Sequence, residues 1–249
     1  MVAAELIGVV GPHLLSPVVP LWERASAVQP PPSGQVIAAT AAVAFLLVAV
    51  PGLWARTRHA VTIVHEGAHA TAAVLTGRRL TGIRLHSDTS GLTVSVGRPT
   101  GAGMVTTVLV GYIGPALLGL GSAALLRAGH AVGLLWLLLV ALLVLIVQVR
   151  NWFGLWSMLV FGALIVAVTW WASAEVQVAF AYLVTWFLLI AAPRPVIELQ
   201  RLRRRRRTSG SDADVLARLT HLPGLVWVGF FLVVDVGALG LGGWWLLGL

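Results

Sequence analysis

Cysteine and lysine are both absent from this chain of 249 residues. The lack of cysteine excludes a disulfide framework and any thiolate metal site. Charge is scarce as well, since charged residues make up 10% of the sequence, against roughly 25% in soluble globular domains. The chain is 58% hydrophobic and has a mean hydropathy of +0.92. Such a sequence cannot cover itself with a water-compatible surface, so we expect an integral, multi-pass membrane protein.

The few charges are strongly biased, with 17 basic and 9 acidic residues and a formal net charge of +8. The densest basic run, RLRRRRR at Arg201–Arg207, directly follows a predicted membrane helix. Such runs occur in RNA-binding segments and at membrane surfaces, and the position of this one favours contact with anionic lipid headgroups. We therefore expect anionic lipids at this Arg-rich loop and no nucleic-acid partner.

Long apolar segments predict an all-α polytopic membrane protein with about six to seven transmembrane helices. Residues 1–34 are interpreted as an N-terminal interfacial segment and Pro-rich linker, with a short or half-inserted helix as the alternative. Residues 35–249 form the predicted transmembrane domain, which includes a basic cytoplasmic loop at 193–221. Each span needs about 20 mostly apolar residues. The predicted spans are Val36–Trp54, Arg58–Leu75, Met104–Leu126, Ala131–Val149, Trp152–Trp171, Val176–Ala192 and Leu222–Leu247.

Arginine-bearing loops orient this predicted bundle, because basic residues concentrate on the cytoplasmic side. The basic segment Arg194–Arg207 is assigned to the cytoplasm, and alternation of the helices places Gly77–Gly103 on the same side. Arg56 and Arg58 disagree with the rule, because the same alternation places them outside. Within Gly77–Gly103, apolar and polar residues alternate around the sequence SDTSG. This pattern predicts a short cytoplasmic β-hairpin.

The sequence HEGAH at residues 65–69 places three chemically active side chains in an apolar helix. His65 and His69 are four residues apart, so on a helix they share one face and can take two positions of a tetrahedral zinc site. Glu66 is offset by one residue and is suited to act as a general base on a water molecule. The alternative is that each histidine only bonds a neighbouring carbonyl. An intramembrane Glu between two His needs a compensating partner, which favours bound Zn²⁺.

The ordered motifs of the chain resemble the site-2 protease class of intramembrane zinc metallopeptidases, and more closely its B-like branch. The similarity covers roughly Ala60 to Trp227 and rests on HEGAHATAAVLTGRRLTGIRL, SDTSGLT, GYIGPALLG, RNWFG and SDADVLARLTHLPGLVW. It implies a zinc-dependent peptidase that cuts membrane-bound substrates within or beside the bilayer. It also implies a metal helix that runs from outside to inside and is followed by a short hairpin.

The third metal ligand is not evident, because the L-D-G motif that supplies it in the wider class is missing. Asp212 is the preferred candidate, although Ser211 or Asp212 also suits the N-cap of a helix at Ala213–Leu219. Asn151 and Asp235 are the next candidates, and Asp214 is expected to matter little.

Substrate binding is assigned to Gly114, Pro115 and Asn151. Gly114 and Pro115 lie in GYIGPALLG, where a proline frees a backbone carbonyl. The alternative for this motif is ordinary packing of small residues between helices. Asn151 is placed by the sequence at the cytoplasmic end of a predicted span.

The combined expectation is an intramembrane zinc metalloendopeptidase that acts on a membrane-anchored protein or peptide in a bacterial plasma membrane. The catalytic residue would be Glu66, and the metal ligands would be His65, His69 and Asp212. One alternative is a catalytically inactive membrane scaffold that retains the metal site. A metal transporter is less favoured, because no repeated pair of broken helices is visible in the sequence.

Overall fold

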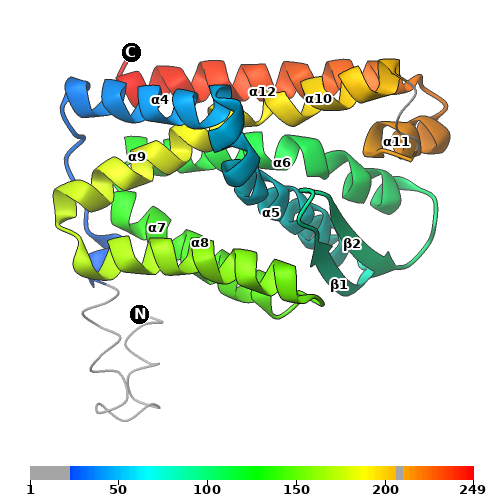
Figure 1. The fold of residues 1–249 in the computed structure, drawn as a ribbon, viewed down its shortest axis with the longest axis horizontal. Helices are drawn as coiled ribbons and strands as arrows, with labels where there is room; N and C mark the ends of the chain where they lie inside the picture. Colours follow the sequence, from blue (N-terminus) through cyan, green and yellow to red (C-terminus); the bar gives the residue numbers. More distant parts are fainter. Residues whose placement is uncertain (1–22, 206–209) are drawn as a thin grey trace, which may run out of the picture.

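The computed structural model describes residues 23–205 and 210–249, and it is mostly helical (Figure 1). The prediction of a mainly helical protein is therefore confirmed. The order of elements is α4 (Gly34–Ala49), α5 (Pro51–Leu75), β1 (Arg79–Leu85), β2 (Gly91–Val96), α6 (Ala102–Arg127), α7 (Ala131–Ile146), α8 (Trp152–Trp171), α9 (Ala174–Ala191), α10 (Pro193–Arg204), α11 (Asp212–Thr220) and α12 (Gly224–Leu247). Residues 1–22, on which most of the predicted interfacial segment falls, lie outside the described residues.

The chain is an integral, multi-pass membrane protein, but it has fewer candidate spans than the six or seven predicted. Within the described residues, α6, α8, α12 and the 31-residue continuous unit of α9 with α10 are long and apolar enough to cross a bilayer. Helices α4 and α5 pass this test only together and are bent by 99°. Helix α7 has 16 residues and is shorter than a full span. The structure therefore contains four candidate spans, or five if the bent pair is one crossing.

The bend between α4 and α5 has a local cause in Pro51. Val50, the residue before this proline, has φ −77° and ψ 120° and is extended, because proline disfavours the helical conformation of its predecessor. Pro51 then begins α5, where its missing N–H is not needed. The first predicted span, Val36–Trp54, is thus broken before it ends.

The bend also explains the two arginines that disagreed with the predicted topology. Gln29 donates its backbone N–H to Gly129, so α4 begins beside the α6–α7 turn. The bend lies beside α10, where Arg58 contacts Glu198 at 3.3 Å. The expectation that Arg58 and Glu198 lie on opposite sides of the membrane is therefore wrong.

The predicted hairpin is present as an antiparallel pair, β1–β2, in which Ile83 opposes Thr93. The second edge of β1 is also occupied, because the Ile83 N–H donates to the Gln148 carbonyl (2.8 Å) and the Arg150 N–H donates to the Ile83 carbonyl (2.9 Å). The hairpin is thereby fixed to the α7–α8 connection and packs on α5.

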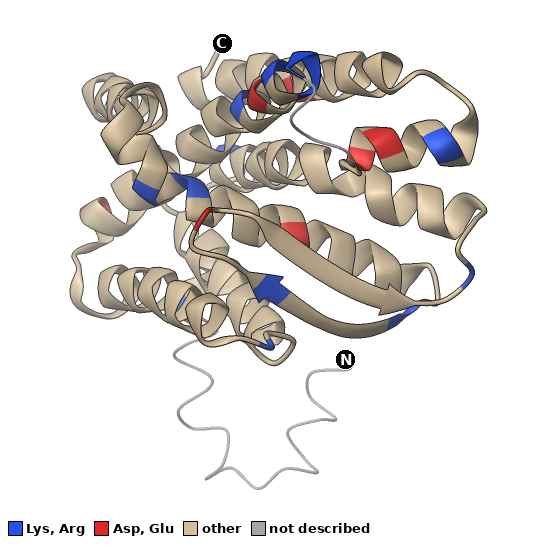
Figure 2. Cartoon of the chain, turned by 45° about the vertical axis from the view of Figure 1, so that its right-hand side comes forward, with Lys and Arg blue, Asp and Glu red and all other residues tan. Residues whose placement is uncertain are grey.

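The predicted basic loop is largely helical. Its first part, α10, continues α9, and its last part, α11, lies across the end of the bundle (Figure 1). Leu216 of α11 is fully buried against α6, α10 and α12, in a cluster that also contains Val108, Val196 and Phe231. Charged residues are sparse along the long helices and gather at helix ends, on the hairpin and on the α10–α11 segment (Figure 2). Arg206 and Arg207 lie outside the described residues.

Candidate metal centre

Helix α5 presents His65 and His69 toward α6 and α11, one helical turn apart. Their rings are perpendicular, with centroids 4.6 Å apart. Gly111 of α6 faces both imidazoles, and a Cβ atom added at this glycine would collide with them. The absence of a side chain at Gly111 therefore creates the space in which the two histidines converge.

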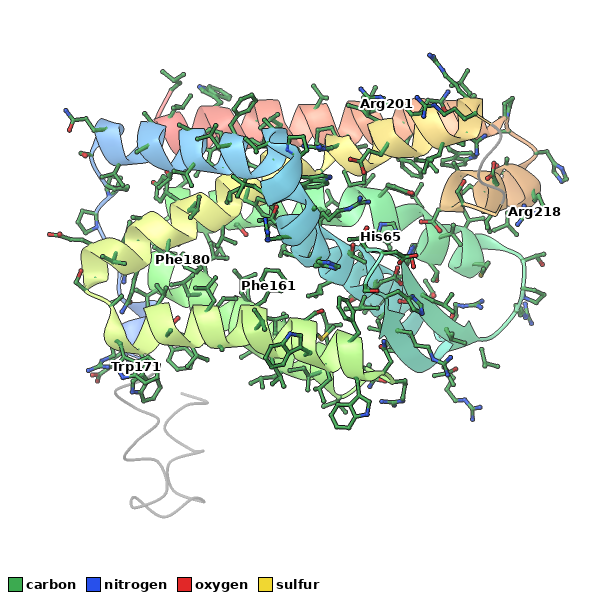
Figure 3. All side chains as sticks on the ribbon, in the orientation of Figure 1. His65, Phe161, Trp171, Phe180, Arg201 and Arg218 are labelled. Atoms are coloured by element: carbon green, nitrogen blue, oxygen red, sulfur yellow. The ribbon has the colours of Figure 1, made fainter. Side chains whose placement is uncertain are left out.

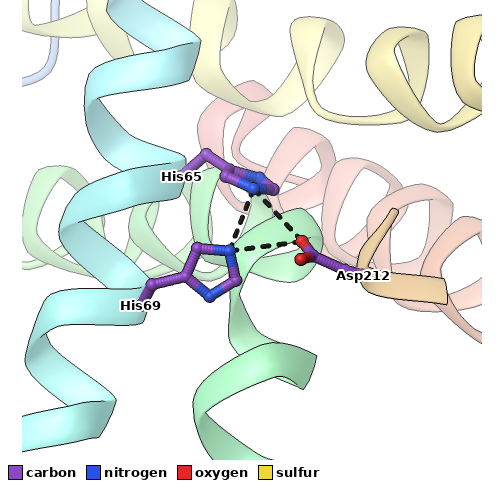
Figure 4. Close-up of side chains that lie close together, drawn as sticks. All are labelled: His65, His69 and Asp212. Carbon is purple, nitrogen blue, oxygen red and sulfur yellow. Dashed lines mark hydrogen bonds and ion pairs between the residues drawn. The ribbon is translucent and has the colours of Figure 1, made fainter. Parts of the chain in front are cut away.

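Asp212 completes a triangle with the two histidines (Figure 4). Its Oδ2 lies 3.3 Å from Nε2 of His65 and 3.2 Å from Nε2 of His69, and the two Nε2 atoms are 3.1 Å apart. Ligands about 2.0–2.1 Å from a tetrahedral zinc are roughly 3.3–3.4 Å from one another. The three atoms are thus spaced as three corners of such a site, and no other group of this kind is found among the described residues.

The state of the Asp212 carboxyl also suits a metal ligand. Oδ2 is buried and has no hydrogen-bond partner of acceptable geometry in the described part of the chain, although two imidazoles are near. A buried unpartnered oxygen is costly, and a cation between the three groups would compensate it. Burial alone would raise the pKa of Asp212, but the contacts with His65 and His69 lower it below its usual range. The carboxylate form that metal binding requires is therefore favoured.

A backbone contact fixes the orientation of His69. Its Nδ1 lies 2.6 Å from the carbonyl oxygen of Thr107. A carbonyl can only accept, so Nδ1 carries the proton and Nε2 keeps its lone pair for a metal ion. His65 is oriented by an edge contact with Tyr112 (ring centroids 4.8 Å apart), which stacks on Phe231. Both ligand nitrogens are thus positioned by their surroundings.

Glu66 is buried between α5 and the hairpin. Its side chain is held by Thr93 of β2, whose hydroxyl donates to Oε2 at 2.6 Å and also lies 3.1 Å from the Glu66 carbonyl oxygen. Gly91, at the start of β2, faces the carboxylate so closely that an added Cβ would collide with it. The hairpin therefore positions Glu66 beside the histidines without making it part of the three-residue group.

A clasp between α10 and α11 holds Asp212 over the histidines. Arg203, in the last turn of α10, donates to Oδ1 of Asp214 and lies 3.4 Å from the hydroxyl of Ser211. Oδ2 of Asp214 accepts the backbone N–H (3.2 Å) and the hydroxyl (2.7 Å) of Ser211, as in a capping box. We call Arg203, Ser211 and Asp214 the α10–α11 clasp. It fixes the helix start that carries Asp212.

Two other residues proposed as ligands lie elsewhere. Asn151 bonds the backbone of Leu85 twice, accepting its N–H at 3.1 Å and donating to its carbonyl at 2.6 Å. Both functional atoms of this amide therefore contact β1 and help to fix its position. The predicted contact of Asn151 with a substrate stays a prediction. Asp235 of α12 is fully buried, and neither carboxylate oxygen has a hydrogen-bond partner among the described residues. It is not part of the metal-binding group.

Gly114 and Pro115 lie in the contact of α6 with its neighbours. A Cβ at Gly114 would be 2.5 Å from the Cβ of Ala68, and Pro115 is fully buried. Close packing of α5 on α6 accounts for the small residue at 114. The predicted substrate contact at these two positions stays a prediction.

Sequence reasoning missed the supporting residues Thr93, Thr107 and Arg203. The spacing of Ser211 and Asp214 is a recognisable capping signal, whereas Thr93 and Thr107 lie far from the motif in sequence and carry no pattern of their own.

Comparison with protein families gave one finding. The family model described as Peptidase M50B-like matches residues 38–242. Comparisons with curated proteins and with solved structures gave no match. The matched region contains most of the bent pair, the hairpin, the histidines of α5 and Asp212. The chain therefore belongs to the Peptidase M50B-like family.

Proposed function

We propose that this protein is an intramembrane zinc metalloendopeptidase that hydrolyses peptide bonds of membrane-anchored substrates. The observation that carries the proposal is the triangle of His65, His69 and Asp212, with Glu66 positioned beside it. Two imidazoles and one carboxylate are a ligand set typical of catalytic zinc, which keeps one position open. Membership of a peptidase family supports the same reaction class.

Zinc held by these three residues would supply Lewis acidity toward a peptide carbonyl and a water molecule. Glu66 has the role of general base, taking a proton from the attacking water and later giving it to the leaving amine. Thr93 keeps one carboxylate oxygen of Glu66 bonded and directs the side chain. Thr107 holds His69 in the required tautomer.

The hairpin offers a place for an extended substrate. In the described sheet, β2 pairs only with β1, so its second edge has no strand partner among the described residues. Thr93, which bonds Glu66, lies in the middle of β2. A peptide added to this edge would gain backbone hydrogen bonds close to the candidate base. The position of Glu66 on α5, within the bent pair, supports a substrate that is itself anchored in the membrane.

The cellular location and membrane orientation of the protein are part of the same proposal. We place the protein in a bacterial plasma membrane, with the Arg-rich α10–α11 segment at the cytoplasmic face against anionic lipid, and without a nucleic-acid partner. The basic composition of that segment supports this orientation.

Substitution of the candidate base tests the proposal. Glu66→Gln keeps the shape of the side chain, so we expect about one zinc per chain to remain while cleavage of a membrane-anchored reporter falls by about a thousandfold. Glu175→Gln, at the first turn of α9, is the matched control and should cleave normally. Unchanged cleavage by Glu66→Gln would refute the catalytic role. A wild-type protein that binds zinc but cleaves no reporter would support the scaffold instead.

The metal assignment has its own test. His65→Ala and His69→Ala should each abolish zinc binding, whereas His130→Ala, at the N-cap of α7, should not. Metal analysis of the purified proteins measures this directly. Full zinc occupancy in the double histidine variant would overturn the ligand assignment.

A further inference from the structure

A second site lies where α4 ends and α10 begins. A cavity of about 350 Å³ is lined there by Phe45, Val48, Ala49, Ile190, Pro193, Arg194, Ile197, Glu198 and Arg201. It lies beside the bend, where α5 turns away from the direction of α4 by 99°. This volume corresponds to about a dozen water molecules at roughly 30 Å³ each, which suits a headgroup-sized ligand.

Positive charge is in excess around this cavity. Glu198 accepts from Trp54 Nε1 (2.9 Å) and pairs with Arg58 (3.3 Å) and Arg194 (3.2 Å). Arg201 also lines the cavity and has no ion-pair partner in the described part of the chain. Two guanidinium groups thus pair with one carboxylate, and Arg201 adds a further positive charge to the lining. A cluster of this kind at the membrane boundary favours an anionic ligand.

The cavity lies toward the C-terminal end of the unit formed by α9 and α10. The continuous unit of α9 and α10 contains 31 residues, which is about 46 Å at a rise of 1.5 Å per residue. The hydrocarbon core is only about 30 Å thick, so the C-terminal part of this unit extends beyond it. Arg194 is about 30 Å from the start of the unit, and Arg201 is about 40 Å from it. Both guanidinium groups therefore lie on the C-terminal part of a unit that is longer than the hydrocarbon core is thick.

The apolar side of the cavity opens toward the bilayer. Phe45 is 58% exposed and Ile197 is 41% exposed, on two different helices. Arg201 of α10, which Figure 3 labels, is exposed. One end of the cavity is therefore suited to a phosphate and the other to the start of acyl chains.

A neighbouring cavity indicates which kind of lipid headgroup the site would bind. It measures about 230 Å³ and is lined by Ile197, Gln200, Arg201, Arg204 and Leu232, so that it shares Arg201 with the first. Oε1 of Gln200 is buried and has no hydrogen-bond partner among the described residues. A carbonyl oxygen of this kind requires a donor, which a hydroxyl on the ligand would supply.

We propose that Arg194 and Arg201 bind the phosphate of an anionic phospholipid with a hydroxylated headgroup, between α4 and α10. Gln200 accepts a hydrogen bond from the headgroup hydroxyl, and the acyl chains lie along Phe45 and Ile197. The site is separate from the metal centre and does not depend on the peptidase proposal. Its occupant holds the bend against α10, because α4 and α10 each line the cavity.

The experiment is native mass spectrometry of the full chain released from nanodiscs that contain phosphatidylglycerol and phosphatidylcholine. The wild type should retain one phosphatidylglycerol, and Arg201→Gln should reduce this retention at least tenfold. Arg218→Gln is the matched control, because Arg218 is exposed on α11 and lines neither cavity. Ala49→Leu, which fills the first cavity without changing charge, should reduce retention as well. If Arg201→Gln does not fold, the Ala49→Leu variant tests the lipid site in its place.

Four outcomes would overturn the proposal or one of its parts. Equal retention of phosphatidylglycerol by the wild type and Ala49→Leu would show that the cavity is not the site. Equal retention of phosphatidylcholine would remove the role of the arginines. Displacement of the lipid by millimolar inorganic phosphate would show a phosphate site rather than a lipid site. Retention of phosphatidic acid equal to that of phosphatidylglycerol would refute the role of Gln200. None of these results depends on cleavage.

Discussion

Replacing Arg203 by alanine should weaken zinc binding although Arg203 lies outside the three-residue metal group. Arg203 joins the last turn of α10 to the first turn of α11 through Ser211 and Asp214. Asp212 lies between these two partners in the sequence, directly after Ser211. Removal of the guanidinium would therefore loosen the segment that carries the third ligand and leave the two histidines in place.

The expected loss of zinc affinity can be estimated from the solvent exposure of the Arg203–Asp214 ion pair. Hydrogen bonds to charged groups contribute about 1.5–3 kcal/mol when buried. The side chains of Arg203 and Asp214 are 21% and 25% exposed, so solvent screening reduces the contribution to about 1 kcal/mol. Zinc affinity cannot fall by more than the free energy with which the clasp favours the docked position of α11. We therefore expect a loss of about three- to fivefold, since about 1 kcal/mol corresponds to about fivefold.

The assay is competition for zinc with a chelator of known affinity. Arg203→Lys keeps the charge but offers no planar pair of donors, so its affinity should be intermediate. Arg205→Ala is the control, because Arg205 is exposed and has no ion pair among the described residues. The double variant Arg203→Ala/Asp214→Ala should lose little more than either single variant. Additive losses, or wild-type affinity in a folded Arg203→Ala protein, would refute the clasp.

Two further predictions concern the surroundings of the metal ligands. Gly111→Ala should abolish zinc binding, because the added Cβ would collide with both imidazoles, whereas Gly121→Ala on the same helix meets no atom within 4 Å and should bind zinc normally. Metal content and thermal unfolding compare the two, and zinc-bound Gly111→Ala would contradict the geometry. Thr93→Val should lower the kcat for reporter cleavage about tenfold, through loss of a bond worth about 1–3 kcal/mol, and leave zinc content unchanged. Thr93→Ser should restore the rate, and a Thr93→Val enzyme with normal kcat would show that the hydroxyl does not position the base.

The sequence was informative where one local pattern decides the structure. Alternation around SDTSG predicted the hairpin, and helical spacing predicted that His65 and His69 share a face. It failed for the number of spans, because hydropathy does not register a break such as that at Pro51. The apolar residues on both sides of the break look like parts of complete helices.

Contacts between residues far apart in the chain could not be predicted from the sequence either. Asn151 was proposed as a ligand or a substrate contact because it is polar at a helix end, yet its partner Leu85 is 66 residues away in the chain. Arg58 and Glu198 were assigned to opposite sides of the membrane for a similar reason, since they come close only after the bend forms. The basic segment was expected to face lipid throughout, but Arg203 turns inward to α11.

The sequence left two roles open for Asp212, a metal ligand or a helix N-cap. The structure distinguishes between these two roles. Ser211 is the N-cap, and its N–H is accepted by Asp214, so the cap does not use the Asp212 carboxylate. Asp214, which was expected to matter little, thus has a structural role, while Asp212 in the first turn remains free to face the histidines. Asp212→Ala should lower zinc affinity tenfold or more without changing amide hydrogen exchange in α11 of the metal-free protein. Asp214→Ala should accelerate that exchange, since loss of a cap costs about 1 kcal/mol. Equal acceleration in the two variants would show that Asp212 acts as a cap, and the third ligand would then have to be sought elsewhere.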